Sequence, residues 1–132
     1  MKDLGNSGGL PAETPSSTVE LTAENFSQVT ALSGIVLVDC WAPWCRNCDD
    51  FAKSYRKAAE QHPSHTFATL NTQDQKDVRT TLGIQHVPSL LVYRDGVLLL
   101  QQPGSYDEAA LSDIIAQAAA LDMDMVRKEL GA

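Results

Sequence analysis

The chain has 132 residues, a length that fits one domain with a hydrophobic core of useful size. Hydrophobic residues make up 43% of it, an ordinary globular value, so the composition does not indicate general disorder. The net charge of -7 would repel phosphate backbones, which argues against nucleic acid as a partner.

The first stretch, MKDLGNSGGLPAETPSST, is rich in Gly, Pro, Ser and Asn. This composition predicts a flexible tail over residues 1–17. The stretch has a single lysine and no apolar run, so it does not resemble a secretory signal. No later segment reaches the roughly 18 continuous apolar residues of a membrane helix. We therefore expect a cytoplasmic protein with no membrane partner.

The ordered domain is predicted over residues 18–121 and begins with a short strand at residues 19–21. Thr22 is expected to cap a helix that ends near Leu32. The stretch IVLVDCWA, which starts at Ile35, is β-branched and apolar on both faces. That pattern is typical of a central, fully buried strand.

The middle of the chain alternates helices and strands. Apolar residues at helical spacing predict a helix from about Cys45 to Gln61. TFATLN is the next strand, and DQKDVRTTLG is a short helix stopped by Gly83. PSLLVYR and VLLLQQ are two strands joined by Asp95-Gly96, the strongest short-range hairpin signal.

The last helix is predicted to start behind a capping box formed by Ser105 and Glu108. Its apolar stripe comprises Leu111, Ile115, Ala118, Leu121 and Met125. Because the stripe continues, the helix is expected to run past residue 120. Residues 122–132 would then be a helical extension or a frayed tail.

The predicted element order is β-α-β-α-β-α-β-β-α. Strands that are apolar on both faces need helices on both sides of the sheet. The first strands are joined through helices, which implies parallel pairing, and the hairpin adds an antiparallel edge. The fold class is therefore α/β, with a central mixed five-stranded sheet between two helical layers.

All three cysteines and both tryptophans lie in one stretch, VDCWAPWCRNCDDF, from Val38 to Phe51. Its pair Cys45 and Cys48 could be a redox pair, half of a metal site or a structural pair. A zinc site needs about four ligands, and the chain offers no second cysteine pair, so no metal is expected.

Redox chemistry at this pair follows from elementary arguments. A disulfide is cleaved by a thiolate, not by a thiol. Cys45 would sit at the start of a helix, where free N–H groups and the dipole stabilise negative charge. It is therefore the expected nucleophile. Cys48, one helical turn away, would resolve the mixed disulfide.

Three stretches together resemble the thioredoxin family: VDCWAPWCRNC, GIQHVPSLLVYRDG and Gly104 before the last helix. The combination is far more specific than a lone CxxC. It adds an acid six residues before the first cysteine, the W-A-x-W-C frame and the later V-P. The similarity covers about residues 19–121. It implies a thioredoxin fold and dithiol/disulfide exchange with client proteins.

The resemblance also implies roles for three residues outside the cysteine pair. Asp39, an acid in a buried strand, would transfer a proton to and from Cys48. Pro88 occupies the family's cis-proline position, and Val87 would present backbone groups to an extended client segment. The plainer alternatives are a buried acid kept only by hydrogen bonds and a proline that only shapes a turn.

Further residues near the pair have smaller expected roles. Pro43 and Trp44 would hold the active-site loop and shield one side, and Trp44 and Gly104 would contact the client. Cys40 should point to the opposite face from Asp39 and be an inert core cysteine. His86 is interpreted as a solvated loop histidine.

The sequence departs from the family between the cysteines, where Arg46-Asn47 replaces the usual Gly-Pro. The dipeptide between the cysteines tunes the reduction potential of the pair. Reduction potentials of known pairs of this kind span roughly 150 mV, which corresponds to about 7 kcal/mol for a two-electron couple. The charge of Arg46 should favour the Cys45 thiolate, stabilise the reduced form and raise the potential. The effect of Asn47 has no predictable sign.

Three other departures concern the core. Lys53 stands where the family usually has a helix-kinking proline, and Cys40 replaces a usual aromatic residue. Thr69 stands at the position of the family's lysine near the buried acid. Asp39 is therefore expected to lack a cationic neighbour, so that its pKa should rise.

The function predicted from these observations is reduction of client-protein disulfides by a monomeric, thioredoxin-like oxidoreductase. The resemblance implies a thioredoxin reductase or a dedicated reductase, flavin-dependent, as electron donor, and no bound cofactor besides the redox-active disulfide. One alternative is a disulfide donor or isomerase with a raised potential. Another is a thioredoxin-fold binding or chaperone module with a vestigial dithiol.

Overall fold

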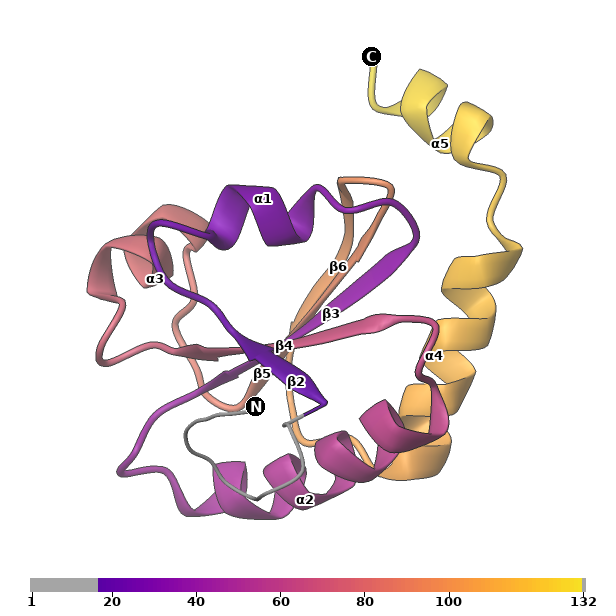
Figure 1. Ribbon diagram of the computed structural model, residues 1–132. Coiled ribbons are helices and arrows are strands. Elements are labelled where there is room, and N and C mark those ends of the chain that lie inside the picture. The colour runs from indigo at the N-terminus through magenta and orange to yellow at the C-terminus, as the bar shows by residue number, and fades with distance from the viewer. Residues whose placement is uncertain (1–16, 132) are drawn as a thin grey trace, which may run out of the picture.

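The computed structural model describes residues 17–131, so the predicted flexible tail lies almost wholly outside the described residues. The strands, labelled in Figure 1, are β2 (Thr18–Glu20), β3 (Ile35–Trp41), β4 (Thr66–Asn71), β5 (Ser89–Arg94) and β6 (Val97–Pro103). The helices are α1 (Phe26–Thr30), α2 (Arg46–Gln61), α3 (Lys76–Leu82), α4 (Glu108–Ala120) and α5 (Met123–Glu129). Within this part of the chain, no helix combines the length and apolar character needed to cross a bilayer.

The sheet has five strands in the order β2-β4-β3-β5-β6. Strands β2, β4 and β3 are mutually parallel, β5 runs antiparallel to β3, and β6 runs antiparallel to β5. The turn between β5 and β6 has positive φ at both Asp95 and Gly96, as the hairpin signal predicted. The predicted mixed five-stranded sheet is confirmed, and β3, which carries Asp39, lies at its centre.

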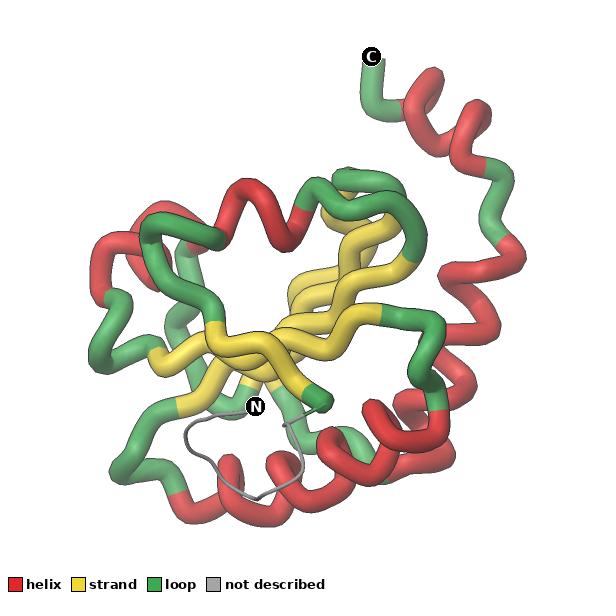
Figure 2. The backbone as a smooth tube through the Cα atoms, viewed as in Figure 1, coloured by secondary structure: helices red, strands yellow, loops and turns green. Residues whose placement is uncertain are grey.

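Alternation along β3 separates the core into two layers. Ile35 and Leu37 pack with α2 and α4 on one face of the sheet. Val36, Val38 and Cys40 pack on the other face, against side chains of α1 and α3. Figures 1 and 2 show this arrangement, with the helix pairs on opposite sides of the strands. Asp39 shares the register of Ile35 and Leu37 and therefore faces α2.

The first helix is shorter than predicted. Thr22 and Asn25 exchange hydrogen bonds in the turn before it, the reciprocal pattern of a capping box, and the Thr22 carbonyl accepts the amide of Phe26 at 3.0 Å. The Thr22 amide donates to Asn25 Oδ1 at 2.7 Å, and the Asn25 amide donates to Thr22 Oγ1 at 3.3 Å. Helix α1 begins only after this turn, at Phe26.

The capping-box prediction for the last helix was wrong. The cap of α4 is Asp107, whose carboxylate accepts the Ala110 amide at 2.8 Å. Aspartate is a strong N-cap residue at the correct spacing from that amide, so it displaces Ser105 from the role. Glu108, expected at the third helical position, is the first helical residue instead.

The helix does not run past residue 120 as expected. Leu121 has an extended backbone, and Asp122 caps a separate helix by accepting the amides of Asp124 and Met125. Arg94 stabilises the break, because its Nη1 donates to the carbonyls of Ala118, Ala119 and Leu121 at 2.7, 3.1 and 2.7 Å. Figure 1 shows α5 leading away from the layered body.

Candidate active site at the Cys45–Cys48 pair

The two cysteines lie at the first turn of α2. Cys45 is the N-cap residue with an extended backbone, and helix α2 begins at Arg46. Its Sγ accepts the amide of Cys48 at 3.2 Å. A disulfide joins the two residues, whose Cα atoms are 5.3 Å apart. A thiolate at Cys45 would meet the free amides and positive end of a 16-residue helix.

The surroundings of the pair are asymmetric. Cys45 is 8% exposed and Cys48 is 2% exposed, so Cys45 is the sulfur closer to solvent. Trp44 is 70% exposed, and Pro43, Arg46 and Asn47 also lie on the surface. An approaching disulfide would therefore meet Cys45 first, beside a large accessible aromatic ring.

A second loop packs against the pair. The Val87–Pro88 peptide bond is cis, as the family resemblance implied. Val87 packs on the small apolar cluster of Ala42, Cys45 and Cys48. Pro88 is buried, and its carbonyl accepts the amide of Gly104 at 2.9 Å. The tertiary structure thus brings the loop before β5, the residue after β6 and the first turn of α2 to one place.

The main chain of Val87 is available for pairing. Among the described residues, no backbone hydrogen bond uses its N–H or C=O group. The backbone on either side of Val87 and Pro88 is fixed by a hydrogen bond, because Ser89 Oγ donates to the carbonyl of His86 at 2.6 Å. His86 itself is exposed. A fixed, unpaired backbone segment beside a reactive sulfur can pair with an extended chain.

Asp39 lies behind Cys48. It is 2% exposed and lines a cavity of about 270 Å³ together with Cys48 and residues of β4 and α2. Burial raises its pKa from 3.8 to about 7, and the positive charge of Arg56 opposes this rise. A carboxyl group that titrates near neutral pH can accept or donate a proton under physiological conditions.

Arg56 is the site residue that the sequence reasoning missed. The register does place Thr69 beside Asp39 on β4, as expected, but the inference that Asp39 lacks a cationic neighbour was wrong. Its pKa is raised because the carboxyl group is buried, despite the arginine. The available signal was helical spacing: Cys48, Ala52 and Arg56 are each four residues apart and share a face of α2.

Cys40 takes no part in this arrangement. It is fully buried on the opposite face of β3, in the cluster that includes Tyr93. Burial, followed by the charge of Asp39, raises the pKa of its thiol. A neutral, inaccessible thiol is inert. Among the described residues, no group of three or more His, Cys, Asp or Glu side chains is placed to hold a metal ion.

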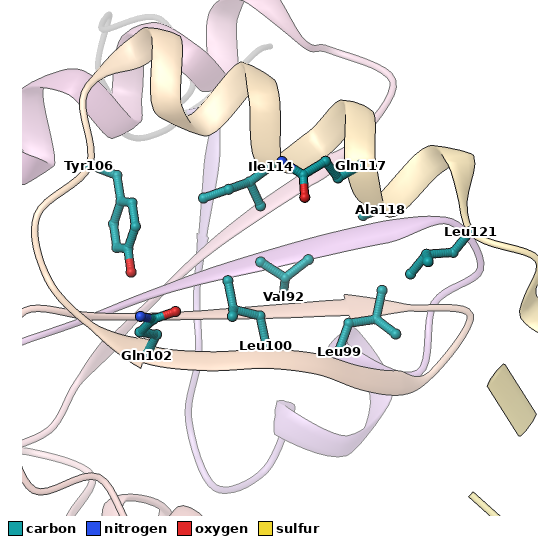
Figure 3. Close-up of a pocket in the computed structure, with 9 residues that line it drawn as sticks. All are labelled: Val92, Leu99, Leu100, Gln102, Tyr106, Ile114, Gln117, Ala118 and Leu121. Atoms are coloured by element: carbon teal, nitrogen blue, oxygen red, sulfur yellow. The ribbon is translucent and has the colours of Figure 1, made fainter. Parts of the chain in front are cut away.

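A larger cavity of about 430 Å³ lies elsewhere, between β6 and α4. Figure 3 shows Leu99 and Leu100 facing Ile114 and Ala118 across it. None of its lining residues belongs to the cysteine site. The smaller cavity, beside Asp39 and Cys48, is therefore the one that adjoins the candidate active site.

Comparison with known proteins agrees with this geometry. The thioredoxin family model matches residues 17–117. A Streptomyces coelicolor protein named "Putative thioredoxin 2" is 46% identical over 112 residues, covering 85% of this chain and 84% of its own. The thioredoxin of Alicyclobacillus acidocaldarius is 34% identical over 103 residues, covering 74% of this chain and 98% of its own.

The fold agrees as well. The solved structure of a mutant thioredoxin from Halobacterium salinarum superposes with a TM-score of 0.73 at 24% identity, covering 83% of this chain and 97% of its own. This likeness supports the fold, and the sequence matches support the family. The chain belongs to the thioredoxin family of thiol–disulfide oxidoreductases.

Proposed function

We propose that the protein reduces disulfides in client proteins, with Cys45 as nucleophile and Cys48 as resolving cysteine. The position of Cys45 carries this proposal. It caps α2, where the helix stabilises a thiolate, and it is the more exposed sulfur of the pair. Val87 and Pro88 would hold an extended client segment beside it, with Trp44 and Gly104 at the edges of the contact.

The exchange balances in two steps. The Cys45 thiolate attacks the client disulfide, forms a mixed disulfide and releases the first client sulfur as a thiolate. Cys48 then loses its proton to Asp39, and its thiolate attacks Cys45 Sγ. The Cys45–Cys48 disulfide forms and the second client sulfur leaves as a thiolate. Two electrons pass to the client, and Asp39 returns its proton through solvent.

The two electrons must be restored from outside the chain. A flavin-dependent reductase, either a general thioredoxin reductase or a dedicated one, would reduce Cys45–Cys48 by the same exchange in reverse. No bound cofactor is needed for either half of the cycle. The cytoplasmic location and the monomeric state stay predictions.

One observation favours the reverse direction. Arg46 is exposed immediately next to Cys45, at the first position of α2. Its charge would stabilise the reduced pair and raise the potential, as a disulfide donor or isomerase requires. The midpoint potential of the pair decides between the two directions.

The experiment equilibrates the protein in graded thiol/disulfide buffers, alkylates free thiols and counts them by mass. A potential near about −270 mV supports the reductant, whereas a potential near about −200 mV or above supports the donor or isomerase. A pair that never closes would leave only a binding module.

Mechanism is tested separately with insulin disulfides as substrate. Cys45→Ser should abolish turnover, and Cys48→Ser should accumulate a mixed disulfide through Cys45. Turnover by Cys45→Ser would contradict the assigned nucleophile.

A further inference from the structure

Asp39 carries an unpartnered oxygen in the cavity beside Cys48. Among the described residues, its buried Oδ1 has no hydrogen-bond partner. An ionised carboxylate in such a place is costly unless an opposite charge acts on it. The neighbours that face it therefore determine how readily it ionises.

The lining of the cavity beside Asp39 offers a single positive charge. Strand β4 contributes the uncharged Thr69, its direct register neighbour, and β3 itself contributes Trp41. The remaining lining residues come from α2: Cys48, Asp49, Ala52 and Arg56. Arg56 is the one cation in this lining, and its charge acts on Asp39 in favour of the ionised form.

Other titratable groups near Asp39 do not supply this charge. Asp49, an exposed residue of α2 that also lines the cavity, carries the opposite sign. Tyr55 and Cys40 are buried, and burial raises both of their pKa values, so that both are neutral at physiological pH. Cys48 is the group that exchanges a proton with Asp39 in the proposed function.

We propose that Arg56 is a positioning residue for disulfide exchange, whose guanidinium favours the ionised form of the Asp39 carboxyl group in the cavity beside Cys48. It acts from α2, the helix that also carries both cysteines. It does not touch the reacting sulfurs. Its head is exposed, so its influence passes across the partly solvated cavity and is moderate in size.

The proton balance in the resolving step shows what Arg56 contributes. Cys48 can give its proton to Asp39 only when Asp39 is ionised. The S–S bond to Cys45 then forms, and the client sulfur leaves with the electron pair of the mixed disulfide. Without the guanidinium, a smaller fraction of Asp39 is ionised at a given pH below its midpoint, and fewer molecules can take the proton.

The chain offers a matched control for this inference. Lys57 follows Arg56 on α2, and its side chain is 68% exposed and 3.9 Å from Glu108, not in the cavity. Arg56→Gln and Lys57→Gln remove the same charge from the same helix. Arg56→Lys keeps the charge at the cavity.

The test is a carboxyl ¹³C NMR titration of Asp39 in the reduced full-length protein. Arg56→Gln should raise the midpoint by about half a pH unit, while Lys57→Gln should leave it unchanged and Arg56→Lys should keep it near wild type. Resolution of a preformed mixed disulfide should then be about threefold slower in Arg56→Gln below the midpoint, and should match wild type at high pH.

The two proposals fail separately. The inference rests on disulfide exchange but not on its direction, and the titration needs no turnover. Equal midpoints in Arg56→Gln and Lys57→Gln, in a wild-type protein that reduces insulin, would overturn the role of Arg56 alone. A wild-type protein without exchange activity would overturn the proposed function instead.

Discussion

The amide of Gly104 donates a 2.9 Å hydrogen bond to the carbonyl of Pro88, which ties the end of β6 to the loop packed on the cysteine pair. Gly104 has φ +140°, and an added Cβ would meet ring atoms of Tyr106 at 3.5 Å. The backbone conformation therefore restricts this position, whereas the added Cβ would make only an ordinary van der Waals contact with Tyr106.

Gly104→Ala is expected to lower the free energy of unfolding by about 1–3 kcal/mol, because alanine is strained at this φ. Urea denaturation measures the change. Gly34→Ala is the control: its φ is +84°, but an added Cβ would meet nothing within 4 Å. If both variants lose the same stability, the contact with Tyr106 contributes nothing.

Trp44→Ala should raise KM for protein disulfides severalfold and leave the free energy of unfolding within about 0.5 kcal/mol of wild type, since the ring is 70% exposed. Reaction of the reduced pair with a small aromatic disulfide should be unchanged. Leu32→Ala, an exposed apolar residue after α1, should change neither value. An unchanged KM would remove Trp44 from the client surface.

Asp39→Asn should change how stability depends on pH. The pKa of Asp39 is raised from 3.8 to about 7, so the folded state holds this proton more tightly than the unfolded state. Wild-type stability is therefore lost as pH rises from about 4 to about 7. The asparagine variant has no such titration. Its free energy of unfolding therefore increases relative to that of wild type by up to about 4 kcal/mol across that window.

Urea denaturation at pH 4.5 and pH 8.5 measures this difference. Asp50→Asn, an exposed acid on α2, controls for a general charge effect. A gain for Asp39→Asn that is equal at both pH values would contradict the raised pKa.

Tyr55→Phe should lower the free energy of unfolding by about 1–2 kcal/mol. The buried hydroxyl donates a 2.7 Å hydrogen bond to the carbonyl of Ala68 and links α2 to β4. Tyr106→Phe removes a hydroxyl that lies near Gly104 and should cost less. Equal losses would show that the bond to Ala68 adds no net stability.

Removal of residues 122–132 should leave disulfide exchange unchanged, because α5 leads away from the layered body and contributes no residue to the cysteine site (Figure 1). Insulin reduction by the shortened chain measures this. Arg94→Gln, which removes the donor to the end of α4, is the comparison and should reduce stability in the full chain. A large loss of exchange on truncation would show that residues 18–121 are not a sufficient domain.

Local sequence patterns predicted the structure correctly wherever a single local preference decides it, as in strand alternation, helix ends and turns. The alternation of β3 predicted that Asp39 and Cys40 face opposite layers, and the structure confirms it. Gly83 ends α3 with φ +71°, and Asp95-Gly96 forms the predicted turn. The N-cap of α4 was harder to predict. Asp107 and Ser105 are both residue types that cap helices, and the backbone conformation after β6 determines that Asp107 takes the position.

The sequence by itself determined the fold class, the order of the strands along the chain and the position of the candidate reactive pair, because these depend on periodicity and on short, specific spacings. Tertiary structure alone decided that Arg56 lines the cavity beside Asp39, that the Gly104 amide donates to the Pro88 carbonyl and that the helix breaks at Leu121. Each of these depends on which side chains meet across elements distant in sequence. Burial and long-range contacts of that kind set the pKa of Asp39, and no local pattern encodes them.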